Sequence, residues 1–226
     1  MSVCRNYNDH SRNNCVEIDH VTKRFGEEEV LKEVTLTLKT GQAYGITGNN
    51  GSGKTVLMKC ICGFLPVTAG SIRVFGKEIG KDCDFPKSLG VIIETPGFLP
   101  HLTGRKNLEI LADLNRRITK ADIRLALRKV GLDPDMKKPV SKYSLGMRQR
   151  LGIAQAIMED PDLLILDEPF NGLDRHGVEE IRKLLLELKQ EGKTILLASH
   201  NEEDIRILCD RVYQMDGGIL KERKGQ

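Results

Sequence analysis

The chain has 226 residues, of which 39% are hydrophobic and 30% charged, with a formal net charge of +3. This length can bury a full core, and the composition is that of a globular protein rather than a fibrous or disordered one. The net charge is too small to indicate a nucleic-acid partner. No apolar stretch approaches the ~20 residues that cross a bilayer, so a membrane role would require a separate membrane-spanning chain.

The first predicted elements are strands. Residues 1–14 are polar, lack the apolar core of a signal peptide and are expected to form a flexible extension. Hydrophobic residues alternate with polar ones from Val16 to Val21 and from Val34 to Leu38, which is typical of half-buried strands in an antiparallel lobe. The six cysteines have no metal-ligand spacing, which indicates reduced thiols in a cytosolic protein.

A glycine-rich segment follows the strand "QAYGIT" and precedes the apolar helix "TVLMKCICGFL". It reads "GNNGSGKT" and fits the phosphate-loop pattern G-x-x-x-x-G-K-[ST] in the context that this motif requires. The loop amides and the positive end of the helix would hold a phosphate chain, Lys54 would bridge the β- and γ-phosphates, and Thr55 would bind Mg²⁺. The predicted nucleotide-binding residues here are Gly48, Asn49, Asn50, Gly51, Ser52, Gly53, Lys54, Thr55 and Val56.

The middle of the chain, about residues 95–158, has a helical pattern. "GRKNLEILADLN" is one predicted helix, and "KADIRLALRKV" is another, with Thr119 and Asp122 spaced as a capping box and Gly131 as the stop.

Two continuous apolar runs, "LLILD" and "TILLAS", predict parallel strands buried on both faces, with the helix "GVEEIRKLLLELKQ" between them. The first run delivers Asp167 and Glu168 to the carboxyl end of its strand, where ligands bind in open parallel sheets. Neighbouring strand residues point to opposite faces, so we expect Asp167 to serve Mg²⁺ and Glu168 to orient or deprotonate a water. His200 ends the second run at the same edge, and "DRVYQMDGGILKER" predicts a final hairpin.

The motifs "GNNGSGKT", "YSLGMRQR", "LLILDEP", "NGLD" and "SH", in this order, resemble the ATP-binding subunit of an ATP-binding cassette (ABC) transporter over about Cys15–Lys221. The resemblance implies an α/β P-loop ATPase domain of ABC type over residues 15–226, with a mostly parallel core sheet, an antiparallel lobe and a helical subdomain. It also implies ATP-driven head-to-tail dimerisation, as a homodimer or with a paired cassette. Hydrolysis would then drive a transmembrane permease, which would hold the chain at the cytoplasmic face of the membrane.

The resemblance assigns roles to single residues. Phe25 matches the ring that stacks on adenine, although a core phenylalanine is the alternative. Asp174 lies in the loop that crosses to the partner. Ser144 and Gly146 match the signature motif that contacts the partner's ATP, and His200 matches the histidine that contacts the γ-phosphate. Lys54, Glu168 and His200 are thus the predicted catalytic residues.

Two departures from the family pattern change what is expected. Glu94 stands where the family usually has a glutamine near the metal, so the predicted metal ligands are Thr55, Glu94 and Asp167, with altered metal dependence or slower hydrolysis. The sequence from Glu94 through the stretch that follows it resembles that of bacterial cassettes that export antimicrobial peptides such as lantibiotics and bacitracin. Two other positions of the signature motif hold Leu145 and Met147. These residues would weaken the ATP-driven closure of the dimer without removing the site.

Two functions remain open. One is a transport ATPase that exports an amphipathic peptide or drug, and the other is a soluble cassette whose dimerisation regulates or repairs a macromolecule without transport. Apolar Phe98, Leu99 and Leu102 are expected to be exposed and to receive a permease helix, with a packed subdomain turn as the alternative. No basic arm indicates a nucleic-acid role.

Overall fold

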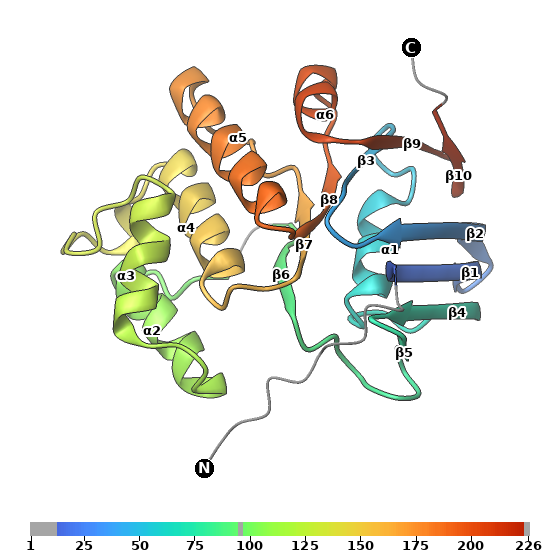
Figure 1. Cartoon of the computed structure of the whole chain (residues 1–226), viewed down its shortest axis with the longest axis horizontal. Coiled ribbons are helices and arrows are strands. Elements are labelled where there is room, and N and C mark those ends of the chain that lie inside the picture. Colours follow the sequence, from blue (N-terminus) through green and yellow to red (C-terminus); the bar gives the residue numbers. More distant parts are fainter. Residues whose placement is uncertain (1–12, 95–96, 224–226) are drawn as a thin grey trace.

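A computed structural model describes residues 13–94 and 97–223, which form two sheets with helices around them (Figure 1). The predicted extension lies almost entirely outside the described residues. One sheet has the strand order β2-β1-β4-β5, and the other has the order β10-β9-β3-β8-β7-β6. The α/β class with an antiparallel lobe and a mostly parallel core sheet is confirmed. None of the described helices combines the length and the apolar character needed to span a membrane.

The antiparallel sheet is built on two long strands. β1 (Asn14–Phe25) and β2 (Glu28–Lys39) are each 12 residues long, followed by β4 (Ala69–Val74) and β5 (Lys77–Glu78). β1 and β2 extend well beyond the alternating segments in the sequence. The pairing of these strands shifts register between Ile18 and Val21, and His20 has a positive φ of 45°. Such a bulge interrupts the two-residue period, so alternation alone underestimates the strand length.

The core sheet is parallel except at one edge. Its strands are β3 (Ala43–Thr47), β6 (Leu89–Ile92), β7 (Leu163–Asp167), β8 (Thr194–Ala198) and β9 (Arg211–Asp216), with β10 (Ile219–Glu222) antiparallel to β9 as the predicted hairpin. In β7, Leu163 and Ile165 pack in one hydrophobic core, whereas Leu164 and Leu166 pack in a second core on the other face. Burial on both faces explains the uninterrupted apolar sequence of this strand.

Helix α1 (Lys54–Ile61) joins the two sheets. It contacts β2 and β4 of the antiparallel sheet and β7 of the core sheet (Figure 1). Its residues Leu57, Met58 and Ile61 are fully buried in the core that the two sheets share. The helix that begins at the phosphate loop is therefore held by both sheets.

The opposite face of the core sheet carries the remaining helices. Between β6 and β7 the chain forms α2 (Gly104–Asn115), α3 (Lys120–Lys129), the 3-10 turn η1 (Val140–Lys142) and α4 (Leu145–Ile157). α2 has the predicted bounds, and Thr119 and Asp122 form the predicted capping box of α3. These helices form the left side of Figure 1. The division of the chain at about residues 95 and 158 stays a prediction.

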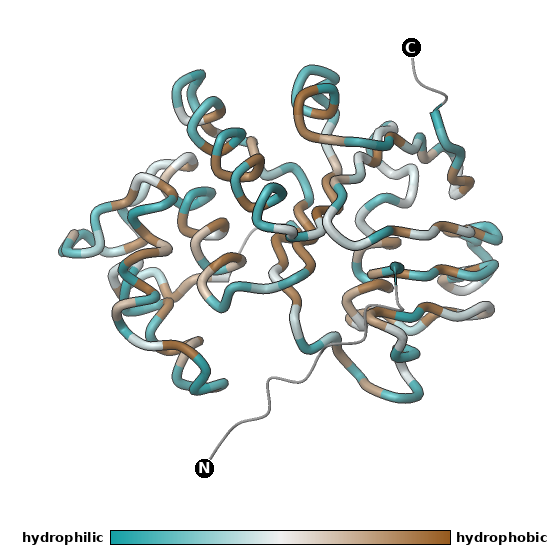
Figure 2. Tube along the Cα trace, in the orientation of Figure 1, coloured by the Kyte–Doolittle hydropathy of each residue, from teal (hydrophilic) through white to brown (hydrophobic). Residues whose placement is uncertain are grey.

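The last two helices are α5 (Arg175–Gln190) and α6 (Glu202–Leu208). α5 is amphipathic, with Ile181, Leu184, Leu185 and Leu188 buried and its other side hydrophilic, as the alternating colours along this helix show (Figure 2). The spacing of three and four residues between buried positions matches one face of a helix.

The expected exposure of the apolar segment after β6 is only partly confirmed. Leu99 is 44% exposed. Phe98, in contrast, is partly buried against the core of the helical side, and Leu102 is half-buried. Phe98 was expected to be exposed because the surrounding Pro and Gly residues suggested an open loop, but its ring finds apolar neighbours.

Candidate nucleotide site

The phosphate loop, Gly48–Thr55, connects β3 to α1 and depends on its glycines. Gly48, Gly51 and Gly53 have positive φ angles of 145°, 77° and 111°. A Cβ atom on Gly48 would lie 2.2 Å from the carbonyl oxygen of Met215. Only glycine adopts these angles readily and also allows the close approach of another backbone segment. The loop is thus shaped for backbone amides rather than for side chains.

Helix α1 begins without a side-chain cap and has no acidic residue in its first turn. Each other α-helix in the described part of the chain has a capping side chain, namely Thr103, Thr119, Ser144, Asp174 and Asn201. The first amides of a helix have no partner within the helix and carry its positive partial charge. At α1 these amides remain directed at the space enclosed by the loop, which is suited to an anion such as phosphate.

Side chains of the loop complete this arrangement. The Lys54 ammonium donates to the carbonyl oxygens of Gly48 at 2.7 Å and Asn49 at 3.0 Å. The Ser52 Oγ atom is buried and has no hydrogen-bond partner among the described residues. A buried hydroxyl without a partner is costly, and a phosphate oxygen beside the loop would satisfy it. Asn49, Asn50 and Gly51 are exposed at the loop tip, and Val56 is half-buried.

Thr55 and Asp167 meet at the carboxyl end of β7. The Thr55 hydroxyl donates to Asp167 Oδ2 at 2.6 Å. Asp167 follows Leu163 and Ile165 at alternate positions, so its side chain points to the same face as theirs, toward α1. A hydroxyl and a carboxylate are hard oxygen ligands of the kind that Mg²⁺ takes, with waters and phosphate oxygens in the other positions. The two residues therefore fit a Mg²⁺ site.

Glu168 and His200 form a second pair at this edge. The His200 Nδ1–H donates to Glu168 Oε2 at 2.9 Å, joining the ends of β7 and β8. Glu168 has a positive φ of 50° and its N–H bonds the carbonyl oxygen of Ala198. Asp167 and Glu168 thus have different neighbours, although Glu168 lies just beyond β7 and has a left-handed φ, so strand alternation does not set its direction. One edge of the core sheet collects Lys54, Thr55 and both pairs.

Glu94 does not join this cluster in the structure. Its carboxylate accepts a hydrogen bond from the Lys59 ammonium of α1 at 2.6 Å, and its φ is 60°. Residues 13–94 and 97–223 contain no group of three His, Cys, Asp or Glu side chains that could hold a metal ion. Glu94 as a metal ligand stays a prediction, and no sequence pattern indicates Lys59 as its partner.

Phe25 ends β1 with its ring 46% exposed, and the Lys23 ammonium lies 4.9 Å from the ring centroid. The ring is thus not a core phenylalanine, and a cation against an aromatic face is a favourable contact. Stacking of Phe25 on adenine stays a prediction.

The signature residues lie at the start of α4. Ser144 caps this helix by accepting from Met147 N at 3.2 Å, and Leu145 is 61% exposed. A Cβ atom on Gly146 would lie 2.8 Å from the carbonyl oxygen of Gly172, so the "NGLD" loop packs against the motif. Asp174 caps α5 by accepting from Gly177 N. Their contacts with a second subunit's ATP stay predictions.

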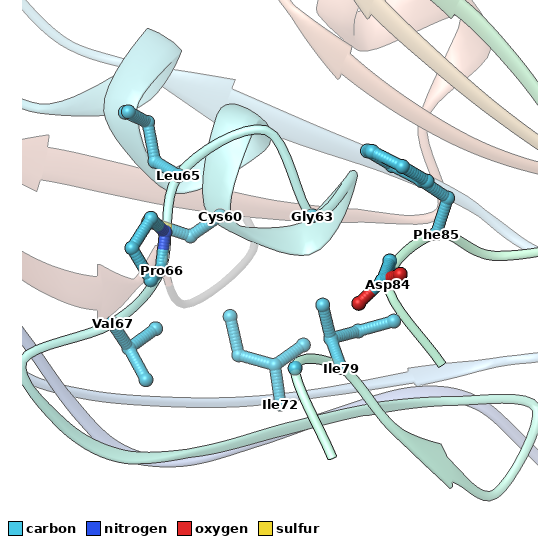
Figure 3. Close-up of a pocket in the computed structure, with 10 residues that line it drawn as sticks. Cys60, Gly63, Leu65, Pro66, Val67, Ile72, Ile79, Asp84 and Phe85 are labelled. Atoms are coloured by element: carbon cyan, nitrogen blue, oxygen red, sulfur yellow. The ribbon is translucent and has the colours of Figure 1, made fainter. Parts of the chain in front are cut away.

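An apolar pocket of about 490 Å³ lies at the other end of α1 (Figure 3). Leu65, Ile72, Ile79 and Phe85 line it, and Asp84 is its one charged lining residue. Its apolar lining is unsuited to a polyphosphate, so this pocket is not the nucleotide site. The sequence patterns did not predict it.

A phosphate loop between a parallel strand and an uncapped helix defines a P-loop nucleotide-binding protein. The family model described as ABC transporter matches residues 31–171, which is more than half of the chain. The chain belongs to the ABC transporter family, and as a cassette of this family it is an ATPase.

Two related sequences and one solved structure are similar to this chain over most of its length. The bacitracin transport ATP-binding protein of Enterococcus faecalis is 44% identical over 92% of this chain and 68% of its own length. The lantibiotic transport ATP-binding protein of Streptococcus pyogenes is 36% identical over 92% of this chain and 90% of its own. A dimeric ATP-binding cassette solved in a post-hydrolysis state with ADP and Pi has a TM-score of 0.82 at 24% identity, covering 93% of this chain and all of that one.

Proposed function

We propose that this chain binds ATP with Mg²⁺ at the phosphate loop and that its hydrolysis drives export of an antimicrobial peptide or drug through a separate permease. The observation that carries the proposal is the convergence of the uncapped α1 amides, the Thr55–Asp167 pair and the Glu168–His200 pair at one sheet edge. The bacitracin and lantibiotic transport relatives support the cargo class.

Each group has a role that follows from its position. The loop amides and Lys54 neutralise the phosphate charge. Thr55 and Asp167 would hold Mg²⁺, which would supply further neutralisation of the phosphate charge. Glu168 orients the attacking water or accepts its proton, and His200 holds the Glu168 carboxylate and contacts the γ-phosphate. The main contribution of the chain is positioning and electrostatic stabilisation.

Two cassettes are proposed to close head to tail, with Ser144, Gly146 and Asp174 of each meeting the nucleotide held by the other. Ser144 stands at the positive end of α4, where its hydroxyl hydrogen is free to donate while its oxygen caps the helix. The similar cassette that is dimeric supports this assembly. In the cell the dimer would lie on the cytoplasmic side of the membrane, held by its permease.

The Lys54→Ala variant tests the ATP site. Removing the ammonium leaves the phosphates without their one loop side-chain cation, so we expect ATP binding to weaken by at least about 100-fold in titration calorimetry. Lys183→Ala, which changes an 80% exposed lysine on α5, serves as the control and should bind ATP as the parent does. Unchanged affinity in Lys54→Ala would refute the phosphate-loop assignment.

The same pair of variants tests the cargo when each replaces the native copy in host cells. Lys54→Ala cells should become sensitive to bacitracin or to a lantibiotic, and Lys183→Ala cells should not. If both strains are equally resistant although purified Lys54→Ala has lost ATP binding, the ATP-site assignment holds. Peptide export as the function would then be refuted.

A further inference from the structure

Helix α4 packs directly on the segment that carries the proposed water-orienting acid. The Gln149 side-chain amide donates to the main-chain carbonyl oxygen of Glu168 at 3.3 Å. Two residues at the start of α4 touch the same segment: a Cβ on Gly172 would lie 2.4 Å from Leu145 Cγ, and one on Gly146 would lie 2.8 Å from the Gly172 carbonyl oxygen. The first half of α4 therefore holds residues 168–172 at two places.

The backbone of Glu168 needs such support. Its φ of 50° is in the left-handed region, which is unfavourable for a residue other than glycine. Its N–H bonds the carbonyl oxygen of Ala198, and its own carbonyl oxygen accepts from Asn171 N at 3.2 Å and from Gln149. Because the side chain leaves the backbone in a direction that the φ angle fixes, contacts at the Glu168 peptide groups determine where its carboxylate points.

We propose that Gln149 is a positioning residue that links two ATP sites through one subunit. In the proposed dimer, on which this inference rests, Ser144 at the start of α4 meets the ATP of the partner, whereas Glu168 faces the ATP of its own subunit. Gln149 lies five residues after Ser144, about 7.5 Å along the same helix. When the partner's ATP binds, α4 shifts. The Gln149 hydrogen bond then moves the carbonyl oxygen of Glu168 and changes the orientation of the Glu168 carboxylate.

The variant Gln149→Glu tests this role because it keeps the side-chain shape and replaces the donor by a carboxylate that repels the Glu168 carbonyl oxygen. We expect kcat to fall by roughly 10- to 100-fold, as for a small displacement of a catalytic group. The affinity for ATP should be unchanged. An ATP-dependent dimer should accumulate in size-exclusion chromatography, because closure still occurs and only turnover is slowed.

Gln155→Glu is the matched control, since it makes the same change of charge on the same helix at a half-buried position away from Glu168. It should retain the kcat of the parent. Gln149→Met removes the donor without adding charge and should show a smaller loss of kcat with the same accumulation of dimer. If Gln149→Glu has a lowered unfolding temperature, the kcat of Gln149→Met decides whether Gln149 positions Glu168.

Two results would overturn the proposal. An unchanged kcat in both Gln149 variants would show that the contact does not position Glu168. A lowered kcat without an ATP-dependent dimer would show that Gln149 acts through the face that meets the partner's ATP instead. A parent protein that neither hydrolyses ATP nor dimerises would overturn the proposed function itself, which is a separate outcome.

Discussion

Glu94 has one cationic partner in the structure and is predicted to bind a second, Mg²⁺. In the structure its carboxylate bonds Lys59, and both side chains are partly exposed, at 64% and 27%. An exposed ion pair of this kind contributes only about 0.2–1 kcal/mol, so it can be exchanged for another cation at little cost. The positive φ of Glu94 marks a backbone held in a sparsely populated conformation, which is common at switch positions.

We therefore expect Glu94→Gln to change the metal dependence of ATP hydrolysis. Loss of a charged oxygen ligand should raise the Mg²⁺ concentration for half-maximal ATPase activity by roughly 3- to 10-fold. Lys59→Gln is the control, because it breaks the same ion pair but keeps the carboxylate, and it should need no more Mg²⁺ than the parent. If Glu94→Gln and the parent have the same Mg²⁺ curve, Glu94 is not at the metal.

The residues of the candidate site differ in how far the sequence could predict their contacts. The pairing of Thr55 with Asp167 follows from a phosphate loop and from a strand whose face is known by alternation. The contacts of Lys59 with Glu94 and of Gln149 with Glu168 do not, because each joins elements through side-chain packing that no local pattern encodes. Hydrogen bonds of this kind become visible only when the helices are placed.

At the scale of elements, β6 and α4 approach closely through Gly90. A Cβ atom on Gly90 would lie 2.1 Å from the carbonyl oxygen of Ala156, a backbone atom of α4 that cannot rotate away. Leu164 and Pro161 lie within 3 Å of the same position. β6, which leads into the helical side, thus packs on α4, which carries the signature residues. The contact leaves no space for a methyl group.

Gly90→Ala should destabilise the fold for this reason, by about 1–3 kcal/mol or more, as expected for overpacking of a tight contact. Gly97→Ala is a suitable control because a Cβ there would meet no atom within 4 Å. Its effect should stay within about 0.5 kcal/mol. Urea unfolding followed by circular dichroism would measure both, and equal midpoints for the two variants would contradict the close packing of β6 on α4.

The predictability of the elements follows the physical source of each pattern. The core strands β7 and β8 were predicted because burial on both faces demands continuous apolar residues. α2 and α3 were predicted because their periodicity and the Thr119 capping box are local features. The full lengths of β1 and β2 were not, since the bulge near His20 breaks alternation while pairing continues.

At the scale of the whole molecule, the proposed cycle alternates between separate and closed cassettes. Closure requires bound ATP, and opening requires its hydrolysis, so blocking hydrolysis should trap the closed state. Glu168→Gln keeps the shape of the side chain and removes the carboxylate that orients or deprotonates water. With ATP and Mg²⁺, this variant should elute as a dimer in size-exclusion chromatography, and Lys54→Ala in the same buffer should elute as a monomer. A monomer in both cases would contradict the closed two-ATP arrangement.

The hairpin of β9 and β10 supports the phosphate loop from the far end of the sequence. Gly218 N donates to the carbonyl oxygen of Ser52, and the Met215 carbonyl oxygen lies where Gly48 leaves no space for a side chain. During synthesis, residues 48–55 leave the ribosome long before residues 215–218 do. The nascent chain therefore completes its ATP-binding loop only after β9 and β10 have been synthesised, and a protein shortened before Arg211 would keep the whole motif yet lack the backbone that shapes it.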